Sequence, residues 1–382
     1  MKAFYILIAM FWMAGASFAE PLGLYVENKT LMHDGAPYRG MGINYYTCFN
    51  TLLAHPENLD FVEGFRILRE KYQIPFIRFA ACPYGSKDWK LYAENPQEYF
   101  RRMDLVVREA EREHLGLIPS LFWRLGAVGD WCDEPLGQLG NPQSKTRAFY
   151  RKYAADMAER YKDSPAIWGW EIGNEYMLGA DLPKLNHLPS PKAGSNEPRT
   201  AEDKIFRSMV LEVYKDVCDT IRSIDSSRII VSGDSLPRNA AWHNHHQDAW
   251  GMDTRDQWLD MLAADTPDCF NTVSMHLYPE HEKNYFADEK VPIEDLVSAA
   301  VRNARERNKP IWCGEFGAAT SGEDEQDMVR RMFRIIEKNE IELSALWNFI
   351  PNGTFQRDAD VTPSNDRAWM LSEIRMFNES LK

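Results

Sequence analysis

The sequence has few of the features that mark several large classes of protein. Its 382 residues contain no apolar run approaching the roughly 20 residues that a membrane-spanning helix needs. Basic residues are scarce: 44 Lys and Arg stand against 57 Asp and Glu, a net charge of −13. Nucleic-acid binding requires basic patches, so a nucleic-acid partner is excluded. The six cysteines include no Cys-x-x-Cys pair, and their spacing specifies no disulfide.

The composition is that of a folded protein with a large core. Hydrophobic residues make up 44% and aromatic residues 12% of the chain, which excludes a disordered protein. Residues 1–19 have the pattern of an export signal peptide: Lys2, an apolar run over residues 4–13, and small residues at Ser17 and Ala19. We expect residues 20–382 to form a single domain that is exported to the periplasm or outside the cell, with no membrane contact after cleavage.

Eight short apolar runs, each followed by a turn and a longer amphipathic stretch, recur along the chain. They begin near residues 40, 75, 117, 167, 229, 271, 310 and 344. Apolar residues at three- and four-residue spacing predict helices over 98–114, 145–162, 201–223, 293–308 and 324–339. Eight strands that alternate with helices predict an α/β fold, a single (β/α)₈ TIM barrel. The competing open sheet lacks a Gly-x-Gly-x-x-Gly after the first strand.

Residues 20–38 precede the first predicted barrel strand. The turn signal His33-Asp34-Gly35 separates residues 24–26 from Tyr38. This pattern predicts a small N-terminal hairpin that closes the barrel floor. Long polar segments over 178–200, 235–254 and 351–366 follow the fourth, fifth and eighth strands. They lie on the face where barrel enzymes hold their active sites.

Polar side chains recur where the apolar runs end. A polar residue inside an apolar strand is costly unless it is paired, so such a ring forms either a network or a site. Glu175 and Glu315 come from the fourth and seventh runs and converge on one mouth. Glycoside hydrolysis needs two such carboxyl groups, because one donates a proton to the leaving oxygen and the other attacks the anomeric carbon or activates water. Arg78 and Tyr278 are suited to keep the second carboxylate ionised.

The motifs at these strand ends resemble glycoside hydrolase family 5, within the clan of retaining barrel glycosidases. The resemblance covers essentially the whole mature chain and is carried by Tyr38-Arg-Gly-Met-Gly-Ile-Asn44, Arg78, Trp170-Glu-Ile-Gly-Asn174-Glu175, His276-Leu-Tyr278, Gly314-Glu315-Phe316-Gly317 and Leu346-Trp347. It implies a retaining β-glycosidase that needs no cofactor and acts on an oligo- or polysaccharide of the β-1,4-mannan or β-1,4-glucan type. We expect a monomer without a metal ion.

The resemblance also implies a role for each matching residue. Glu175 would be the acid/base and Glu315 the nucleophile. The expected substrate contacts are Asn174 on the sugar 2-hydroxyl, Arg78 and Tyr278 beside the nucleophile, His276 along the subsite and Trp347 as the sugar platform. The sequence departs from the family where many members have a His near the end of strand 3. Here the chain reads Ser120-Leu-Phe122-Trp123-Arg124, which leaves the substrate contacts on that wall open.

Two other functions are compatible with parts of the sequence. His243-Asn-His245-His246 has the alternation that opens some metal sites and would indicate a metal-dependent barrel hydrolase, but no carboxylate-plus-His set completes it. A non-catalytic carbohydrate-binding barrel is the second alternative. Loss of Glu175 or Glu315 would favour it, and both residues are present.

Most of the twelve tryptophans are expected in the core. Trp347, Trp123 and Trp242 are the better sugar platforms, because they lie at strand ends or in long loops. Glu171, four residues before Glu175, is expected to pair inside the barrel.

Overall fold

The computed structural model describes residues 20–185, 188, 190–191, 197–279, 286–287, 291–318 and 324–382. The predicted signal peptide, residues 1–19, lies outside the described residues, as does part of the predicted loop 178–200. Within the described ranges, no helix combines the length and the apolar character that crossing a membrane would require.

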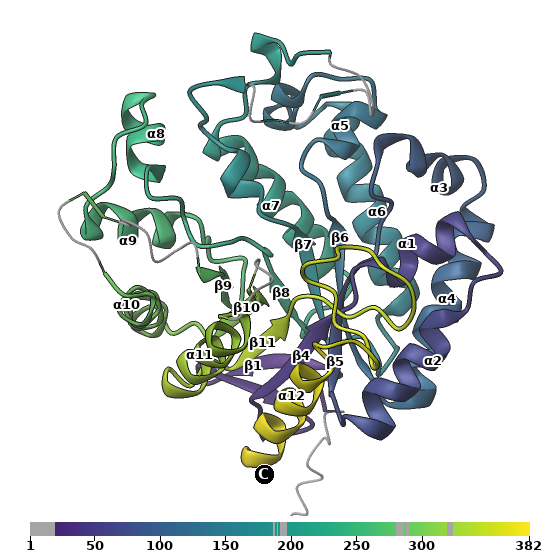
Figure 1. The fold of residues 1–382 in the computed structure, drawn as a ribbon. Helices are drawn as coiled ribbons and strands as arrows, with labels where there is room; N and C mark the ends of the chain where they lie inside the picture. Colours follow the sequence, from purple (N-terminus) through teal and green to yellow (C-terminus); the bar gives the residue numbers. More distant parts are fainter. Residues whose placement is uncertain are drawn as a thin grey trace, which may run out of the picture.

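Eight parallel strands form the central sheet (Figure 1). They are β4 (Gly40–Asn44), β5 (Phe76–Ala80), β6 (Gly116–Phe122), β7 (Gly169–Gly173), β8 (Ile229–Val231), β9 (Val273–Leu277), β10 (Ile311–Phe316) and β11 (Leu343–Leu346). Each strand lies on one of the eight predicted apolar runs. Their order is β8-β7-β6-β5-β4-β11-β10-β9, so the first and last barrel strands are paired through β4 and β11. The predicted (β/α)₈ barrel is confirmed.

The barrel closes between β8 and β9 through side chains and loop groups. The Asn271 N–H donates to the Ile230 carbonyl (3.1 Å), and the Ile230 N–H donates to Asn271 Oδ1 (2.9 Å). Higher up, the Gly233 N–H donates to Ser274 Oγ (3.3 Å). In the described part of the chain these bonds replace a regular ladder. We call this junction the barrel seam.

Helices cover the outside of the sheet (Figure 1). They are α1 (Thr47–Ala54), α2 (Asp60–Arg66), α3 (Lys90–Glu94), α4 (Pro96–Glu113), α5 (Ala127–Trp131), α6 (Lys145–Tyr161), α7 (Arg207–Arg222), α8 (Ala241–Gln247), α9 (Arg255–Ala264), α10 (Ile293–Glu306), α11 (Glu325–Lys338) and α12 (Trp369–Ser380). Side-chain caps begin several of them: Asn95 accepts from the Glu98 N–H at α4, and Ser144 accepts from the Arg147 N–H at α6.

The helix predicted over 201–223 begins six residues later than expected, at Arg207. Residues Ala201–Asp203 form a separate 3₁₀ turn instead. Its cause is the Asp203 carboxylate, which accepts from the Thr200 N–H (2.8 Å) and from the Leu136 N–H (3.1 Å) of another loop. These bonds fix the turn to a distant segment. The helical spacing of apolar residues therefore begins at residue 201, although the helix itself begins only at Arg207.

A three-stranded antiparallel sheet closes the lower end of the barrel. It consists of β1 (Leu24–Glu27), β2 (Thr30–His33) and β3 (Ala36–Pro37). The predicted turn at Asp34 and Gly35 is present, but a second turn at Asn28 and Lys29 makes β1 pair with β2 and not with the segment at Tyr38. The predicted N-terminal floor is confirmed with one more strand than expected.

The floor sheet joins the barrel through an apolar layer. Leu24 and Leu31 pack in one cluster with Trp168 and Trp312 from inside the barrel, and the Leu24 N–H donates to the Trp168 carbonyl (2.7 Å). Gly23 has φ +70°, and a side chain there would collide with the Ile167 carbonyl, so glycine permits this close approach. The layer excludes water from below the barrel axis.

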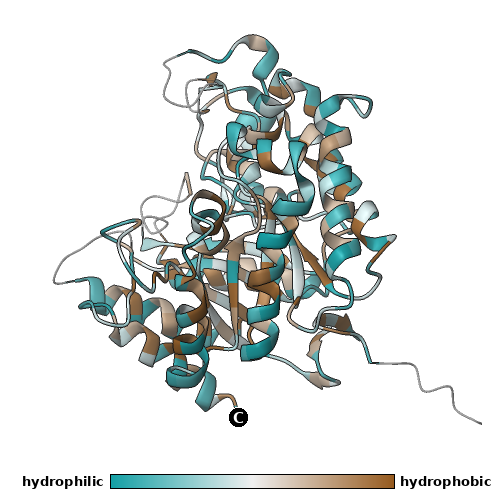
Figure 2. Ribbon diagram, turned by 90° about the vertical axis from the view of Figure 1, so that its right-hand side faces the viewer, coloured by the Kyte–Doolittle hydropathy of each residue, from teal (hydrophilic) through white to brown (hydrophobic). Residues whose placement is uncertain are grey.

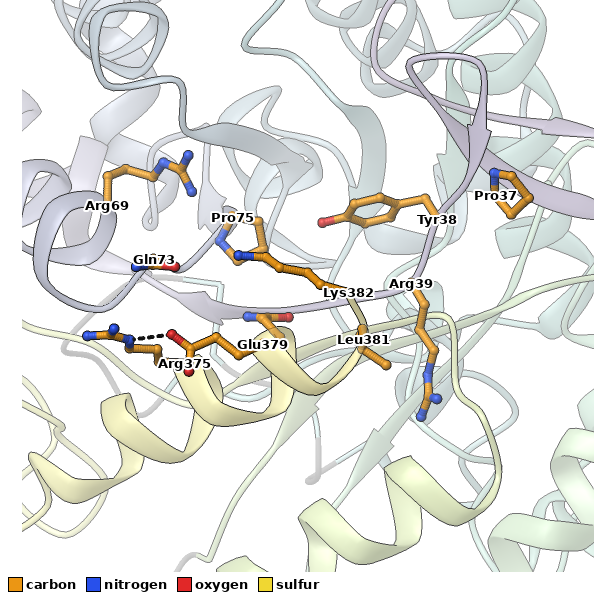
Figure 3. Close-up of a pocket in the computed structure, with 11 residues that line it drawn as sticks. Pro37, Tyr38, Arg39, Arg69, Gln73, Pro75, Arg375, Glu379, Leu381 and Lys382 are labelled. Atoms are coloured by element: carbon orange, nitrogen blue, oxygen red, sulfur yellow. Dashed lines mark hydrogen bonds and ion pairs between the residues drawn. The ribbon is translucent and has the colours of Figure 1, made fainter.

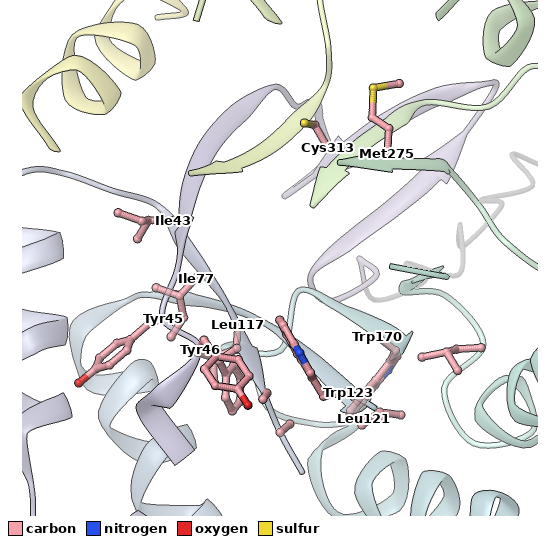
Figure 4. Close-up of a cluster of buried hydrophobic side chains, with 14 of the residues drawn as sticks. Ile43, Tyr45, Tyr46, Ile77, Leu117, Leu121, Trp123, Trp170, Met275 and Cys313 are labelled. Carbon is pink, nitrogen blue, oxygen red and sulfur yellow. The ribbon is translucent and has the colours of Figure 1, made fainter. Parts of the chain in front are cut away.

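A second, larger apolar layer lies between the strands and the helices. Figure 4 shows part of it, with Ile43, Ile77, Leu121, Trp170 and Cys313 pointing away from the barrel axis. Hydrophobic residues gather along the central strands in Figure 2, where hydrophilic stretches lie on the covering helices. Alternate residues of the same strands therefore point inward, where the polar side chains predicted from the strand ends meet.

The floor layer predicts a stability effect for Leu24, which is fully buried. Leu24→Ala should lower the free energy of unfolding by ~2–5 kcal/mol, because it removes apolar contact and leaves a cavity under the barrel. Urea denaturation measures the change. The matched control is Leu22→Ala in the same segment: Leu22 is 41% exposed, and its variant should change stability by less than ~0.5 kcal/mol. Equal losses for the two variants would contradict the floor packing.

Candidate active site

Arg78 of β5 occupies the centre of the barrel and is completely buried. Its Nε donates to both carboxylate oxygens of Glu171 (2.9 and 2.8 Å), which confirms that Glu171 pairs inside the barrel. Its Nη1 donates to Glu315 Oε1 (2.7 Å), and its Nη2 donates to Asn174 Oδ1 (2.8 Å). Burial alone would lower the pKa of Arg78, but the charges of Glu171 and Glu315 outweigh it and raise that pKa. The guanidinium is therefore a permanent cation.

Glu315 lies near the end of β10 with both carboxylate oxygens hydrogen-bonded. Arg78 holds Oε1, and the Tyr278 hydroxyl donates to Oε2 (2.7 Å). Strict alternation would place Glu315 on the outer face beside Cys313. Instead, the pairing of β10 with β9 shifts after Cys313, so that Glu315 pairs with His276. This β-bulge turns the carboxylate into the mouth.

Glu175 follows β7 at a sharp turn, with a left-handed backbone (φ 54°) that is uncommon for a residue with a side chain. Its Oε1 lies 2.9 Å from His276 Nδ1. The same imidazole nitrogen is 3.7 Å from Glu315 Oε2. His276, which is fully buried, therefore lies between the two carboxylates.

The proton affinities of the site follow from burial and charge. Burial alone would lower the pKa of His276, but the Glu315 charge and the bond to Glu175 outweigh it and raise this pKa above the usual 6.5. Burial raises the pKa of Tyr278 well above its usual range, and the Glu315 charge adds to the effect. Tyr278 therefore stays a protonated donor, and the imidazole favours its charged form.

All seven residues that the sequence proposed as a site lie at this end of the barrel. Hydrogen bonds, together with the 3.7 Å contact between His276 and Glu315, link six of them into one polar network. The network lies inside the barrel above the floor layer. The seventh, Trp347, follows β11 and is half-buried. Its indole Nε1 donates to Gln356 Oε1 (2.9 Å), which fixes the ring against the loop after β11.

Tyr46, which the sequence did not single out, packs beside Trp347. The ring of Tyr46 lies 5.9 Å from Trp347, 4.7 Å from Trp123 and 4.9 Å from the exposed Phe355. Trp123, expected as a sugar platform, is almost fully buried and packs on the Arg78 guanidinium (4.5 Å). Tyr46 directly follows the Asn44-Tyr45 strand end, the one local signal that could have identified it.

Where many family members have the strand-3 His, the wall carries Trp123 and Arg124. Arg124 lies over the exposed Tyr84 ring (5.1 Å) and lines a cavity of about 450 Å³ together with Asn174 and Glu175. This cavity adjoins Glu175 and is open to the mouth. It gives room for a ligand group on the Glu175 side of the site.

The histidines at 243–246 do not converge on one point. His243 Nδ1 faces Asp253 (2.7 Å), whereas His245 Nδ1 faces Asp181 (2.7 Å). Trp242, expected as a platform, packs against His246 (4.5 Å) on α8. The His243 contact lies within the loop after β8, and the His245 contact joins this loop to the segment after β7; neither belongs to the network around Arg78.

One group of possible metal ligands does occur in the described residues. Glu175, His276 and Glu315 each offer an atom within 4.8 Å of the others. However, both Glu315 oxygens are held by Arg78 and Tyr278, and His276 Nδ1 is directed at Glu175. A dication there would have to compete with a buried guanidinium, so the donor set fits a charged hydrogen-bond network better than a metal centre.

A cavity of about 740 Å³ lies at the opposite end, between the floor and α12 (Figure 3). Arg39, Arg69 and Arg375 line it. Arg39 and Arg69 donate to main-chain carbonyls, and Arg375 pairs with Glu379 (2.8 Å). Because these cations already serve the fold, the cavity does not compete with the mouth as a site.

The barrel and the paired carboxylates at its mouth have the architecture of the (β/α)₈ hydrolases. The model of the cellulase family, glycosyl hydrolase family 5, matches residues 76–353. The chain belongs to this family.

Two curated relatives are named as mannanases. Mannan endo-1,4-beta-mannosidase 1 of Arabidopsis thaliana is 22% identical over 253 residues, covering 59% of this chain and 53% of that protein. Probable mannan endo-1,4-beta-mannosidase C of Aspergillus terreus is 45% identical over 174 residues, covering 45% and 37%. The chain thus spans about half or less of the length of these relatives.

Solved structures share the fold at low identity. The endo-1,4-beta-mannanase of Rhizomucor miehei superposes with a TM-score of 0.67 at 16% identity, covering 94% of this chain and 99% of that one. A beta-glucanase of Saccharophagus degradans gives 0.58 at 16% identity, covering 98% of both chains. At such identities the likeness establishes the barrel fold.

The raised pKa of His276 leads to a spectroscopic prediction. Its imidazole should titrate above pH 6.5, and Glu175→Gln should lower that pKa because it removes a negative charge beside Nδ1. Proton NMR of the ring, assigned with a His276→Asn variant, measures it. Since the folded-state pKa is raised, the stability that protonation contributes is present below about pH 6.5 and is lost as pH rises through the folded value.

The control for this titration is Glu379→Gln on α12, at the other end of the barrel, which should leave the His276 titration unchanged. A His276 signal that titrates below pH 6.5 would contradict the placement between two carboxylates.

Proposed function

We propose that this protein is an exported, retaining β-glycoside hydrolase that cleaves β-1,4-linked mannan by double displacement. Glu315 is the nucleophile, and Glu175 is the acid/base. Residues 20–382 form one catalytic domain that works as a monomer without a cofactor.

The observation that carries the proposal is the distance between the two carboxylates. One oxygen of Glu175 and one of Glu315 lie within 4.8 Å of each other. Retaining glycosidases place these groups ~5–5.5 Å apart, whereas inverting enzymes need ~6.5–9.5 Å to admit a water molecule between carboxylate and sugar. The shorter spacing supports direct attack by a carboxylate.

The different environments of the two carboxylates support their different roles. Glu315 accepts hydrogen bonds from Arg78 and Tyr278, which stabilise its ionised form and aim it at an anomeric carbon. Glu175 faces the His276 imidazole at 2.9 Å, a group that exchanges protons. In the first step Glu315 attacks and Glu175 gives its proton to the leaving oxygen.

The second step reverses the proton transfer. Glu175 takes a proton from water, whose oxygen then attacks the glycosyl–Glu315 ester and releases the sugar with its original configuration. Asn174, fixed by Arg78, is placed to hold the sugar 2-hydroxyl beside the reacting carbon. Trp347, fixed by Gln356, offers its ring face to the sugar at the cleavage point.

The names of the relatives favour mannan as the substrate, because both curated relatives are described as mannan endo-1,4-beta-mannosidases. The His276-Leu-Tyr278-Pro sequence at the end of β9 is in keeping with this class. β-1,4-Glucan is the second candidate, since the family model is that of cellulases and a beta-glucanase shares the fold.

A substrate panel tests the sugar. The purified protein should hydrolyse β-1,4-mannan with a kcat/KM at least ~10-fold above that for β-1,4-glucan, a difference of ~1.4 kcal/mol in transition-state binding. Reducing-sugar assays in the presence of a chelator measure both. Faster cleavage of β-1,4-glucan would identify glucan, and not mannan, as the preferred substrate. Binding of the polymers without cleavage would support the non-catalytic barrel, and activity that needs added Zn²⁺ would support the metal-dependent hydrolase.

Variants of the catalytic pair test the mechanism. Glu315→Ala should abolish turnover, with azide restoring it as an α-glycosyl azide. Glu175→Ala should slow cleavage of natural substrate by ~10²–10⁴-fold, spare dinitrophenyl glycosides in the first step, and give a β-glycosyl azide on rescue. The matched control is Glu57→Ala, an exposed carboxylate outside the mouth, which should keep the normal rate. NMR of the first product should show retained configuration; inversion would make the assignment wrong.

A further inference from the structure

We propose that Cys218 and Cys269 form a disulfide that fastens the barrel seam between β8 and β9. The inference rests on the export part of the proposed function, because disulfides form and persist in oxidising compartments. In the structure all six cysteines are free thiols, so the proposal concerns the oxidised, exported form.

The two cysteines lie on opposite sides of the seam. Cys218 is on α7, the helix that leads into β8. Cys269 lies in the segment between α9 and β9. A disulfide between them would join α7, the helix before β8, to the segment that leads into β9.

Contacts on either side of the pair bring the two segments into register. The Tyr214 ring, one turn before Cys218, packs edge-on against Phe270 (5.0 Å). Arg222, one turn after Cys218, donates from Nη2 to Asn271 Oδ1. Between these contacts, the thiol groups of Cys218 and Cys269 lie close enough for each to shift the pKa of the other. The contacts on both sides therefore hold the two cysteine-bearing segments beside each other.

The surroundings make Cys269 the attacking thiol. Cys218 is 1% exposed, whereas Cys269 is only half-buried and open to a reagent. The neighbouring Cys218 thiol and the positive charge of Lys309 lower the pKa of Cys269 against the effect of burial. By contrast, burial raises the pKa values of Cys82 and Cys313, which lie inside the core.

The oxidation requires a disulfide-donating oxidant of the exported compartment. The Cys269 thiolate attacks one sulfur of that disulfide, forms a mixed disulfide and releases the first oxidant thiolate. The Cys218 thiol then loses its proton and attacks Cys269 Sγ, forming the Sγ–Sγ bond and releasing the second oxidant thiolate. The protein loses two hydrogens and two electrons, and the oxidant disulfide becomes two thiols.

Oxidation of the purified full chain tests the pairing. The reduced protein is incubated with glutathione disulfide and alkylated under denaturing conditions, and its mass and peptides are then measured by mass spectrometry. The expected product has lost two hydrogens, retains four alkylatable cysteines, and gives a peptide in which Cys218 is linked to Cys269. Cys269→Ser should lose no hydrogens, and Cys218→Ser should stop at a glutathione adduct on Cys269. A linkage between any other two cysteines, or six alkylatable thiols after oxidation, would overturn the proposal.

The unfolding temperature gives a second measurement, which does not depend on identifying the linked peptide. The disulfide closes a loop of about 50 residues, and the oxidised protein should unfold at least ~2 °C above the reduced protein. The same oxidant should leave the unfolding temperature of Cys269→Ser unchanged. An oxidised form with the Cys218–Cys269 link but an unchanged unfolding temperature would show that the bond does not fasten the seam.

The disulfide and the export proposal fail in different ways. In the fraction recovered outside the cytoplasm, mass spectrometry should find a chain that begins near Glu20 and carries the link. Absence of the protein from that fraction would contradict export while the purified chain still formed the bond. An exported chain with both thiols free would overturn the disulfide while export stood.

Discussion

The rest of the site depends on one buried guanidinium. Arg78 is shared by Glu171 below it and Glu315 above it, and it also fixes Asn174. A cation enclosed by protein is tolerated only if its donors are satisfied, and removing one partner of a buried pair costs ~3–5 kcal/mol. The positions of Glu315, the Asn174 amide and the Trp123 ring stacked on Arg78 are therefore consequences of a single desolvated charge.

Glu171 makes this arrangement possible because it neutralises Arg78 from the side away from the mouth. Trp312 from β10 donates its indole N–H to the same carboxylate (2.9 Å), so Glu171 is fully paired within the barrel. Two carboxylates four residues apart on one strand segment thus have separate tasks. Glu171 balances charge and is inaccessible, whereas Glu175 lies at the turn and reaches the mouth.

The elements of the barrel could be predicted from the sequence because each strand is a short apolar run with its own helix. What failed depended on contacts between distant segments. The turn that Asp203 holds to Leu136 delays α7, and the residues at Asn28 and Lys29 add a strand to the floor without the turn signal that Gly35 gives. No local pattern in the chain records such bonds.

The candidate active site also combines features that the local sequence predicts with features that depend on contacts between distant segments. Glu315 was identified by its motif, but the alternation of β10 would turn it outward; the bulge after Cys313 that turns it inward is set by pairing with β9. Trp123 was expected as a sugar platform because it lies at a strand end, and the sequence does not reveal that Arg78 covers its face.

The floor layer of Leu24, Leu31 and Trp312 has a consequence for the charged groups around Arg78. Since it keeps water and salt from beneath the barrel, the electric field of these charged groups is screened from one direction only and reaches the solvent through the mouth.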